Sequence, residues 1–266
     1  MSQSQRVPVL MYHRVGEAQN AWEARYAISA DGFAAHMRAL AAAGYRPVEI
    51  DAFVAWLEGG AALPEGAFLL TFDDGFQGVR EHALPVLEAL RWPFTVFLLS
   101  DLIGGEDVWT RKSNPSGQTY PLLNAEEIRD MQGRGCSFQS HTRSHASLPT
   151  LDDAALADQL AGSRQALAEL LGHAVDYIAY PFGHLDERVV AATRAAGYRA
   201  AFATQPGFNR RDVDRYRIRR LDVFGTDTPA MLLRKMRFGS NDGSLAQAIR
   251  YFLERLRSRL PGGGGA

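Results

Sequence analysis

Cysteine, net charge and long apolar runs are all scarce in this sequence. Cys136 is the only cysteine in 266 residues, so the chain can form neither an internal disulfide nor a cysteine-based zinc ribbon. Lys and Arg number 29 against 30 Asp and Glu, and this net charge of −1 does not predict a nucleic-acid partner. The sequence has no apolar run of the length of a transmembrane helix, and residues 1–15 lack the apolar core of a signal peptide. These absences predict a cytoplasmic protein.

Short apolar runs alternate with stretches of helical period along the whole chain. Helical patterns cover 31–44, 151–172, 185–197 and 243–260, and strand-like runs occur at 7–12, 46–50, 66–72, 93–100, 136–140, 176–182, 198–204 and 216–223. This alternation predicts an α/β fold with parallel strands and helices outside. About eight units in about 250 residues fit a (β/α) barrel, although a doubly wound sheet would give the same pattern.

We expect one domain over residues 1–260 and a flexible tail over 261–266, which reads PGGGGA. The helix expected at 243–260 has an apolar face and four arginines elsewhere. Packing on the barrel is the simpler expectation for this helix, and peripheral membrane contact is the alternative.

Polar residues that can catalyse reactions stand at the ends of several apolar runs. His13 follows the first run, Asp73 and Asp74 follow the run 66–72, and His141 follows 136–140 with His145 four residues later. In parallel α/β proteins the carboxyl ends of the strands form one face, and active sites lie there.

Asp73 and Asp74 are followed by Gly75. Neighbouring residues on a regular strand point to opposite faces, but Gly75 allows a turn that brings both carboxylates to one site. Two close carboxylates do not both ionise easily without a positive partner, and a divalent metal would supply it. The simpler alternative is an ordinary Asp-Gly turn.

His141 and His145 have a spacing that suits one face of a helical turn, with their Cβ atoms about 5–6 Å apart. Together with Asp74 they would provide the two imidazoles and one carboxylate of a catalytic zinc site. Zn²⁺ is the ordinary expectation for these ligands, and Co²⁺, Ni²⁺ or Fe²⁺ fit them too. Such His pairs also arise by chance on polar helix faces.

The segments TFDDG, SHTRSH and AYPFG resemble the first three motifs of the polysaccharide deacetylases, the nodulation-protein-B type or carbohydrate esterase family four. PVLMYHRV, FAAHMRALAAAGYRPV and AATRAAGYRAAFAT are similar to the branch that deacetylates poly-N-acetylglucosamine exopolysaccharides. The likeness covers roughly residues 7–225. It implies a distorted, TIM-like (β/α) barrel of seven or eight units and a role in exopolysaccharide biosynthesis.

The resemblance also implies roles for individual residues. Asp73 would be the general base, and Asp74, His141 and His145 the metal ligands. A backbone N–H at the Pro181-Phe182 step, taken as that of Phe182, would stabilise the oxyanion. Tyr180, Pro181 and Phe182 are also candidate walls for a sugar ring.

Two positions depart from the common family pattern. The arginine that pairs with the base in the third motif is replaced by Ala179. Arg219 and Arg220 at the last strand could provide that charge, and we favour Arg220. The late histidine of the family is absent, since no His follows His184. In the exopolysaccharide branch the equivalent His comes from the first strand, so His13 becomes the candidate general acid.

The sequence therefore predicts a metal-dependent hydrolase that removes N-acetyl groups from an N-acetylated polysaccharide or its glycan precursor and releases acetate. One alternative keeps the amidase chemistry but acts on a small or lipid-linked sugar. A catalytically silent carbohydrate-binding barrel is the other alternative, and the complete set of candidate catalytic residues argues against it.

Overall fold

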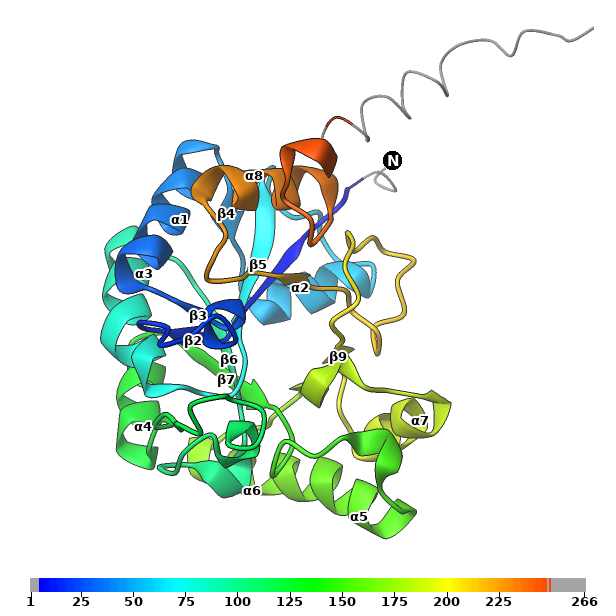
Figure 1. Ribbon diagram of the computed structural model, residues 1–266. Helices are drawn as coiled ribbons and strands as arrows, with labels where there is room; N and C mark the ends of the chain where they lie inside the picture. Colours follow the sequence, from blue (N-terminus) through cyan, green and yellow to red (C-terminus); the bar gives the residue numbers. More distant parts are fainter. Residues whose placement is uncertain (1–4, 248, 250–266) are drawn as a thin grey trace, which may run out of the picture.

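Eight short strands, all paired in parallel, form the centre of the molecule (Figure 1). The structure is a computed structural model, and it describes residues 5–247 and 249. The strands are β1 (Val9–Tyr12), β4 (Arg46–Pro47), β5 (Ala67–Phe72), β6 (Thr95–Leu98), β7 (Ser137–Ser140), β8 (Tyr177–Ala179), β9 (Ala200–Phe202) and β10 (Leu221–Asp222). Every apolar run expected to form a strand contains one of them. The predicted α/β class is confirmed.

The sheet curls into a distorted barrel. It runs β10-β1-β5-β6-β7-β8-β9, and β4 pairs with the start of β5. Beyond β9, a parallel bridge joins Phe202 to Ile218, and the chain then continues into β10, which pairs with β1. A single bridge and a two-residue strand thus connect the two ends of the sheet.

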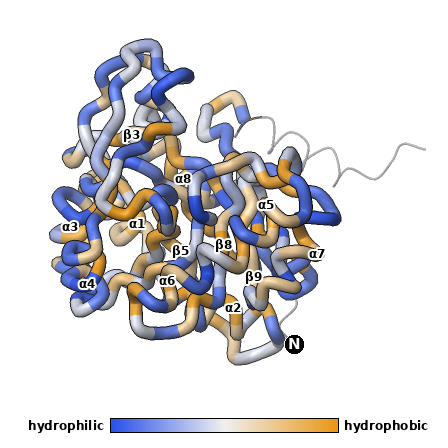
Figure 2. Tube along the Cα trace, turned by 90° about the horizontal axis from the view of Figure 1, so that it is seen from below, coloured by the Kyte–Doolittle hydropathy of each residue, from blue (hydrophilic) through white to orange (hydrophobic). Residues whose placement is uncertain are grey.

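The helices surround the strands, and all of them except α2 cover the outside, as the alternation of patterns predicts (Figure 1). They are α1 (Ala30–Ala42), α2 (Ile50–Leu57), α3 (Leu84–Leu90), α4 (Ala125–Gly133), α5 (Asp153–Ala157), α6 (Ser163–Leu171), α7 (Glu187–Ala195) and α8 (Pro229–Phe238). Hydrophilic and hydrophobic residues alternate along the outer helices (Figure 2). The helix expected over 151–172 is divided by a π-helical turn at Asp158–Gly162.

Successive strand residues face two different parts of the core. Leu10 and Phe72 belong to the large outer cluster between strands and helices, whereas Val9 and Leu69 belong to a second cluster. The buried residues of α2 belong to this second cluster, so α2 packs against the inward-facing strand residues. Alternation along β1 and β5 also means that the residues following these strands, His13 and Asp73, continue the inward-facing series.

Two expectations concern the C-terminal end of the chain. Most of the helix expected at 243–260, and all of the tail at 261–266, lie outside the described residues. None of the helices in the described part of the chain combines the length and apolar character that a bilayer crossing requires.

A chain of buried polar side chains links α1, β1 and α8. The Tyr12 hydroxyl lies 3.0 Å from Nδ1 of His36, and Nε2 of His36 lies 2.7 Å from the Asp227 carbonyl oxygen. Because a carbonyl only accepts, Nε2 carries the proton and Nδ1 accepts from Tyr12. The Asp227 carboxylate forms a buried ion pair with Lys235, whose ammonium also donates to the Asp222 carbonyl oxygen at 2.9 Å. This chain fixes the segment that follows β10.

The Asp227–Lys235 pair provides a test of this packing. Asp227→Ala leaves the Lys235 charge buried without its partner, which should lower the free energy of unfolding by about 3–5 kcal/mol. Urea denaturation followed by circular dichroism measures the change. Asp153→Ala is the control, because Asp153 pairs with Arg188 at the surface. Equal stability of the two variants would contradict the proposed importance of the buried pair.

Candidate active site

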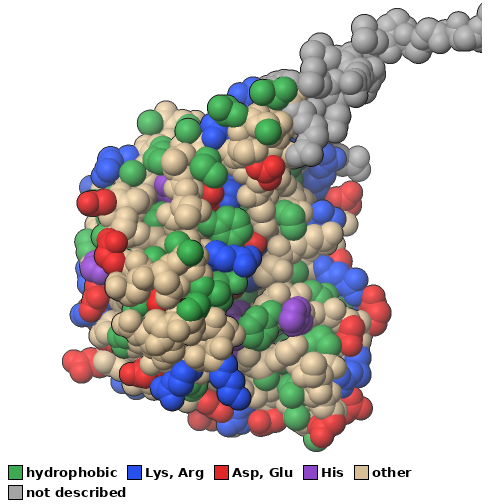
Figure 3. Space-filling model, in the orientation of Figure 1, with side chains coloured by type: hydrophobic (Ala, Val, Ile, Leu, Met, Phe, Trp, Pro, Cys, Tyr) green, Lys and Arg blue, Asp and Glu red, His purple; other side chains and the backbone are tan. Residues whose placement is uncertain are grey.

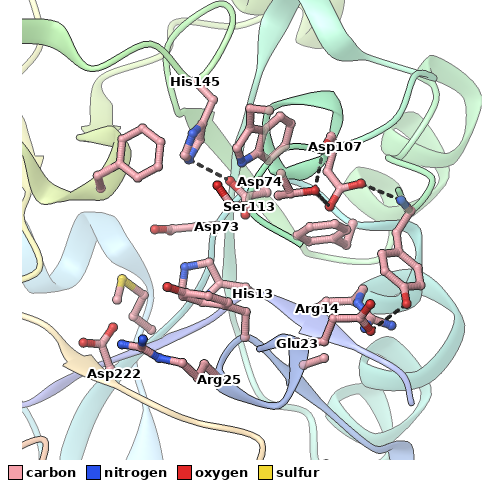
Figure 4. A pocket seen from close by; sticks show the side chains of 18 of the residues that line it. His13, Arg14, Glu23, Arg25, Asp73, Asp74, Asp107, Ser113, His145 and Asp222 are labelled. Atoms are coloured by element: carbon pink, nitrogen blue, oxygen red, sulfur yellow. Dashed lines mark hydrogen bonds and ion pairs between the residues drawn. The ribbon is translucent and has the colours of Figure 1, made fainter. Parts of the chain in front are cut away.

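The candidate catalytic residues lie where the parallel strands end. The Asp73 N–H donates to the Tyr12 carbonyl at 2.9 Å, and the His141 N–H donates to the Leu98 carbonyl at 2.7 Å. Both residues therefore extend the hydrogen-bonded ladder by one step before the chain turns away. They line one pocket of about 450 Å³ together with His13, Asp74 and His145. The labelled side chains of His13, Asp73, Asp74 and His145 point into this space (Figure 4).

The turn after β5 depends on an unusual backbone conformation. Asp74 has φ 73° and Gly75 has φ 78°, both in the left-handed region. A Cβ on Gly75 would lie 2.6 Å from Cδ2 of Leu98, so a side chain does not fit at this position. Both the conformation and the close approach explain the glycine. The turn allows Asp73 and Asp74 to reach the same pocket.

Asp74, His141 and His145 form a cluster that could hold a metal ion. One ligand atom from each residue lies within 4.8 Å of those of the other two, and all three residues are buried. Nε2 of each histidine is 3.4 Å from Oδ1 of Asp74. That oxygen is buried and accepts no hydrogen bond. Two imidazole nitrogens and a carboxylate oxygen converging on one point suit a zinc-like ion.

The two histidines lie on a loop, and the helical turn predicted for them is wrong. Residues 141–145 form no helix, and both Thr142 (φ 74°) and His145 (φ 61°) are left-handed. Nδ1 of His141 donates to the Ala179 carbonyl at 2.8 Å, which leaves Nε2 free as a ligand atom. His145 is held differently, because its ring stacks on Trp109 and meets the edge of Phe182, with centroids 4.6 and 4.4 Å away.

Burial determines the protonation of this cluster. It raises the pKa of Asp74 well above its ordinary value, and the neighbouring carboxylates of Asp73 and Asp107 add to this effect. Burial also lowers the pKa of His141 to about 4 and that of His145 well below its ordinary value. Both imidazoles are therefore neutral near pH 7 and present lone pairs. A cation would remove the cost of ionising Asp74.

Asp73 forms a two-pronged ion pair with Arg220. The two guanidinium nitrogens Nη1 and Nη2 lie 2.6 and 2.8 Å from Oδ1 and Oδ2, and both side chains are buried. Nε of Arg220 donates to the Ala203 carbonyl at 2.9 Å. Burial alone would raise the pKa of Asp73, but Arg220 and, more weakly, His141 lower it to about 2. The cation beside Asp73 is therefore Arg220.

His13 lies across the pocket from the cluster. Burial lowers its pKa, while the carboxylates of Asp73 and Asp222 act in the opposite direction. Sequence reasoning missed Asp222, which lines the same pocket and accepts a hydrogen bond from Asn241 at 2.8 Å. The predicted strand 216–223 ran one residue past Asp222, whereas the observed strand β10 ends at Asp222, so the rule of polar residues at strand ends did not single it out.

The third motif places Tyr180 and Phe182 at the pocket. Phe182 lines it and is 52% exposed, with φ 59°. Tyr180 is fully buried, and its hydroxyl donates to the Tyr216 carbonyl at 3.2 Å. Pro181 is also buried. Tyr180 nevertheless lines the pocket from its buried position, whereas Pro181 is not among the lining residues. Their role as walls for a sugar ring stays a prediction.

Two loops that the sequence did not single out form the outer walls of the pocket. Trp22, Arg25 and Tyr26 come from the segment between β2 (Arg14–Val15) and β3 (Ala27–Ile28), and Asp107 and Trp109 come from the segment after β6. On the face seen in Figure 3, hydrophobic side chains gather near the middle, and charges of both signs surround them.

Comparison with known proteins agrees with this geometry. The polysaccharide deacetylase profile matches residues 60–201, and residues 19–55 match a structural repeat of polyglycine hydrolase-like proteins. YxkH of Bacillus subtilis, named as a candidate polysaccharide deacetylase, is 26% identical over 218 residues, which cover 82% of this chain and 71% of YxkH.

One further relative is named as an N-deacetylase, and one solved structure has a similar fold. The poly-beta-1,6-N-acetyl-D-glucosamine N-deacetylase of Staphylococcus epidermidis is 23% identical over 210 residues, covering 74% of this chain and 68% of that protein. The structure of IcaB from Ammonifex degensii superposes with a TM-score of 0.71 and 27% identity, covering 89% of this chain and 98% of IcaB. With its matching fold and family profile, the chain belongs to the polysaccharide deacetylase family, whose members are hydrolases of C–N bonds.

Proposed function

We propose that this protein uses a divalent metal to hydrolyse N-acetyl groups of an N-acetylated polysaccharide or its glycan precursor, with release of acetate. The observation that carries the proposal is the pairing of two unlike carboxylates in one pocket. Asp73 is held ionised by Arg220, while Asp74 lies with two neutral histidines. One carboxylate is thereby suited to accept a proton and the other to bind a cation.

Asp74, His141 and His145 would hold the metal, and Zn²⁺ is the ion that their donor set suits best. Co²⁺, Ni²⁺ and Fe²⁺ accept similar ligands. When bound, such an ion polarises a carbonyl oxygen and makes a water molecule more acidic. The unpartnered oxygen of Asp74 and the free Nε2 atoms support this assignment.

The other residues of the pocket then divide the proton transfers. Asp73 accepts the proton of the attacking water, and Arg220 keeps it ionised beforehand. The N–H of Phe182 belongs to the first turn of a short 3₁₀ helix, Pro181–Gly183, which offers it no acceptor, so it can stabilise the oxyanion. His13 donates a proton to the departing amine, and its lowered pKa makes it a stronger acid once charged.

The names of the relatives support an N-acetylglucosamine polymer as the substrate. The Staphylococcus epidermidis relative is named for poly-beta-1,6-N-acetyl-D-glucosamine. Aromatic side chains at the pocket, among them Phe182 and Trp109, provide apolar faces that suit sugar rings. A substrate panel should include N-acetylglucosamine oligomers, a lipid-linked N-acetylated sugar and small acetamides. Activity on the last two alone would refute the proposal that the substrate is a polymer.

Substitution of the two aspartates should have different effects on activity and on metal content. With N-acetylglucosamine oligomers, Asp73→Asn should abolish acetate release but keep the metal, because an amide cannot accept the proton. Asp74→Asn should lower the metal content itself, as should His145→Ala. Acetate assays and elemental analysis of the same preparations make the comparison. Equal loss of metal in Asp73→Asn and Asp74→Asn would show that the assigned roles are wrong.

Arg220 should control the acid side of the pH profile. Without the guanidinium, burial raises the pKa of Asp73, so Arg220→Met should move the acid limb of kcat/KM to higher pH. The direction follows because the base acts only when ionised. Arg219→Met is the control, since the hydrogen bonds of Arg219 go to Asn209 and Pro206 and none goes to Asp73. An unchanged acid limb in a folded Arg220→Met variant would refute the pairing as a source of activity.

His13→Ala tests the general acid. Removal of a positioned acid should lower kcat by about 10²–10⁴. The metal content should stay at the wild-type level, because His13 is not part of the ligand cluster. Near-wild-type turnover with metal bound would mean that another group supplies the proton.

A further inference from the structure

A buried carboxylate outside the catalytic cluster joins the two loops that wall the pocket. The Glu23 side chain is 2% exposed and takes no part in the proton transfers described above. Its Oε2 accepts hydrogen bonds from Nη2 of Arg14 at 2.9 Å, from the Gln19 N–H at 2.9 Å and from the Tyr120 hydroxyl at 2.6 Å. Its Oε1 accepts from the side-chain amides of Asn114 at 2.9 Å and Asn20 at 3.3 Å. Five donors thus surround one carboxylate.

These donors come from two segments that are distant in sequence. We call residues 14–26 the first wall and residues 107–120 the second wall. The first wall provides Trp22, Arg25 and Tyr26 to the pocket, and the second provides Asp107 and Trp109. Figure 4 shows Glu23 and Arg14 at the side of the pocket, with a dashed contact from Glu23 to the second wall.

Little besides side chains fixes one wall against the other. Their regular structure is limited to short 3₁₀ turns at Glu23–Arg25 and Val108–Thr110 and the two-residue strand β2. No backbone hydrogen bond joins the two walls among the described residues. Apart from the bonds to Glu23, Nδ2 of Asn20 donates to Oδ1 of Asn114 at 3.0 Å, and the Arg14 guanidinium lies 3.6 Å from the centroid of the Tyr120 ring.

Glu23 is ionised in this setting. Burial alone would raise its pKa, but the hydrogen bonds from Tyr120, Gln19 and Asn114, together with the charge of Arg14, lower it below its ordinary value. A carboxylate that only accepts hydrogen bonds has no proton to donate near pH 7. Its contribution is therefore one of position.

We propose that Glu23 is a positioning residue that holds the first and second walls at the spacing required to bind the sugar, and thereby sets the affinity for the substrate. The part of this proposal that concerns the substrate rests on the proposed function. Asp73, His141 and Arg220 are held by strand ends and by their own partners. Trp109 of the second wall stacks on His145, and Tyr26 of the first wall meets the ring of His13, but His145 is also flanked by Phe182, which belongs to neither wall. We therefore expect loosening of the walls to weaken binding more than the chemical step.

Glu23→Gln is the sharpest substitution because it keeps the shape of the side chain. The new amide NH₂ group would replace either Oε1, which accepts two hydrogen bonds, or Oε2, which accepts three. In both cases a donor would face donors, and those hydrogen bonds would be lost. At saturating metal, we expect KM for N-acetylglucosamine oligomers to rise by about tenfold or more, as expected when charge-assisted hydrogen bonds are lost, while kcat changes by less than about threefold. Glu187→Gln is the matched control, since Glu187 pairs with Arg217 at the surface and its side chain is 87% exposed.

A second readout does not depend on activity. Hydrogen–deuterium exchange of the amides in both walls should increase in Glu23→Gln and remain at the wild-type level in Glu187→Gln, with metal content unchanged in both. Tyr120→Phe removes one donor but keeps the ring under Arg14, and should change KM and exchange in the same direction by a smaller amount. This milder variant decides the question if Glu23→Gln does not fold.

The outcomes separate the two proposals. Unchanged exchange in both walls, or an unchanged KM with a folded variant, would overturn the role of Glu23. Absence of acetate release by the wild-type enzyme would refute the proposed function, and the exchange measurement would still decide whether Glu23 holds the walls.

Discussion

Parallel strands that end at one edge of a curled sheet are the constraint on which this site depends. Asp73 and His141 each make one more ladder hydrogen bond beyond their strands, and only then does the backbone leave the sheet. Their side chains are therefore fixed by the barrel and not by loops. The residues that follow the ladder have strained backbones, since φ is left-handed at Asp74, Thr142, His145 and Phe182. Among the described non-glycine residues, only Arg91 shares this conformation away from the pocket.

Burial of charge is the second determinant of the site. At the mouth of the barrel, burial raises the pKa of Asp74, whose carboxylate has no cationic partner. The guanidinium beside Asp73 lowers the pKa of that carboxylate instead. Two adjacent residues of the same type thus differ in pKa largely because of a single arginine, Arg220, which lies just before β10. The same principle explains why Lys235 and Asp227 are found together in the core behind the pocket.

The sequence was informative where a physical rule links neighbouring residues. Every apolar run marked a strand, and the polar residues just after these runs meet in one pocket because parallel strands end together. The helical turn expected at His141–His145 was wrong, because spacing alone does not distinguish a turn from a loop with left-handed residues. The sequence did not indicate that Tyr180, which lines the pocket, would be fully buried, because its burial depends on packing near Tyr216. Glu23 could not be found from the sequence, because its partners lie 91 and 97 positions away in segments without periodicity.

The position of Arg220 in the chain has a consequence for how the protein is made. Its partner Asp73 lies 147 residues earlier, and the segment that carries Arg220 also connects the two ends of the barrel. During synthesis from the N-terminus, the strands β1 to β9 emerge before either event can occur. A nascent chain therefore has unpaired strand edges and a carboxylate without its cation until residues 218–222 leave the ribosome. Closure of the sheet and pairing of Asp73 with Arg220 therefore depend on the same short segment and are completed together.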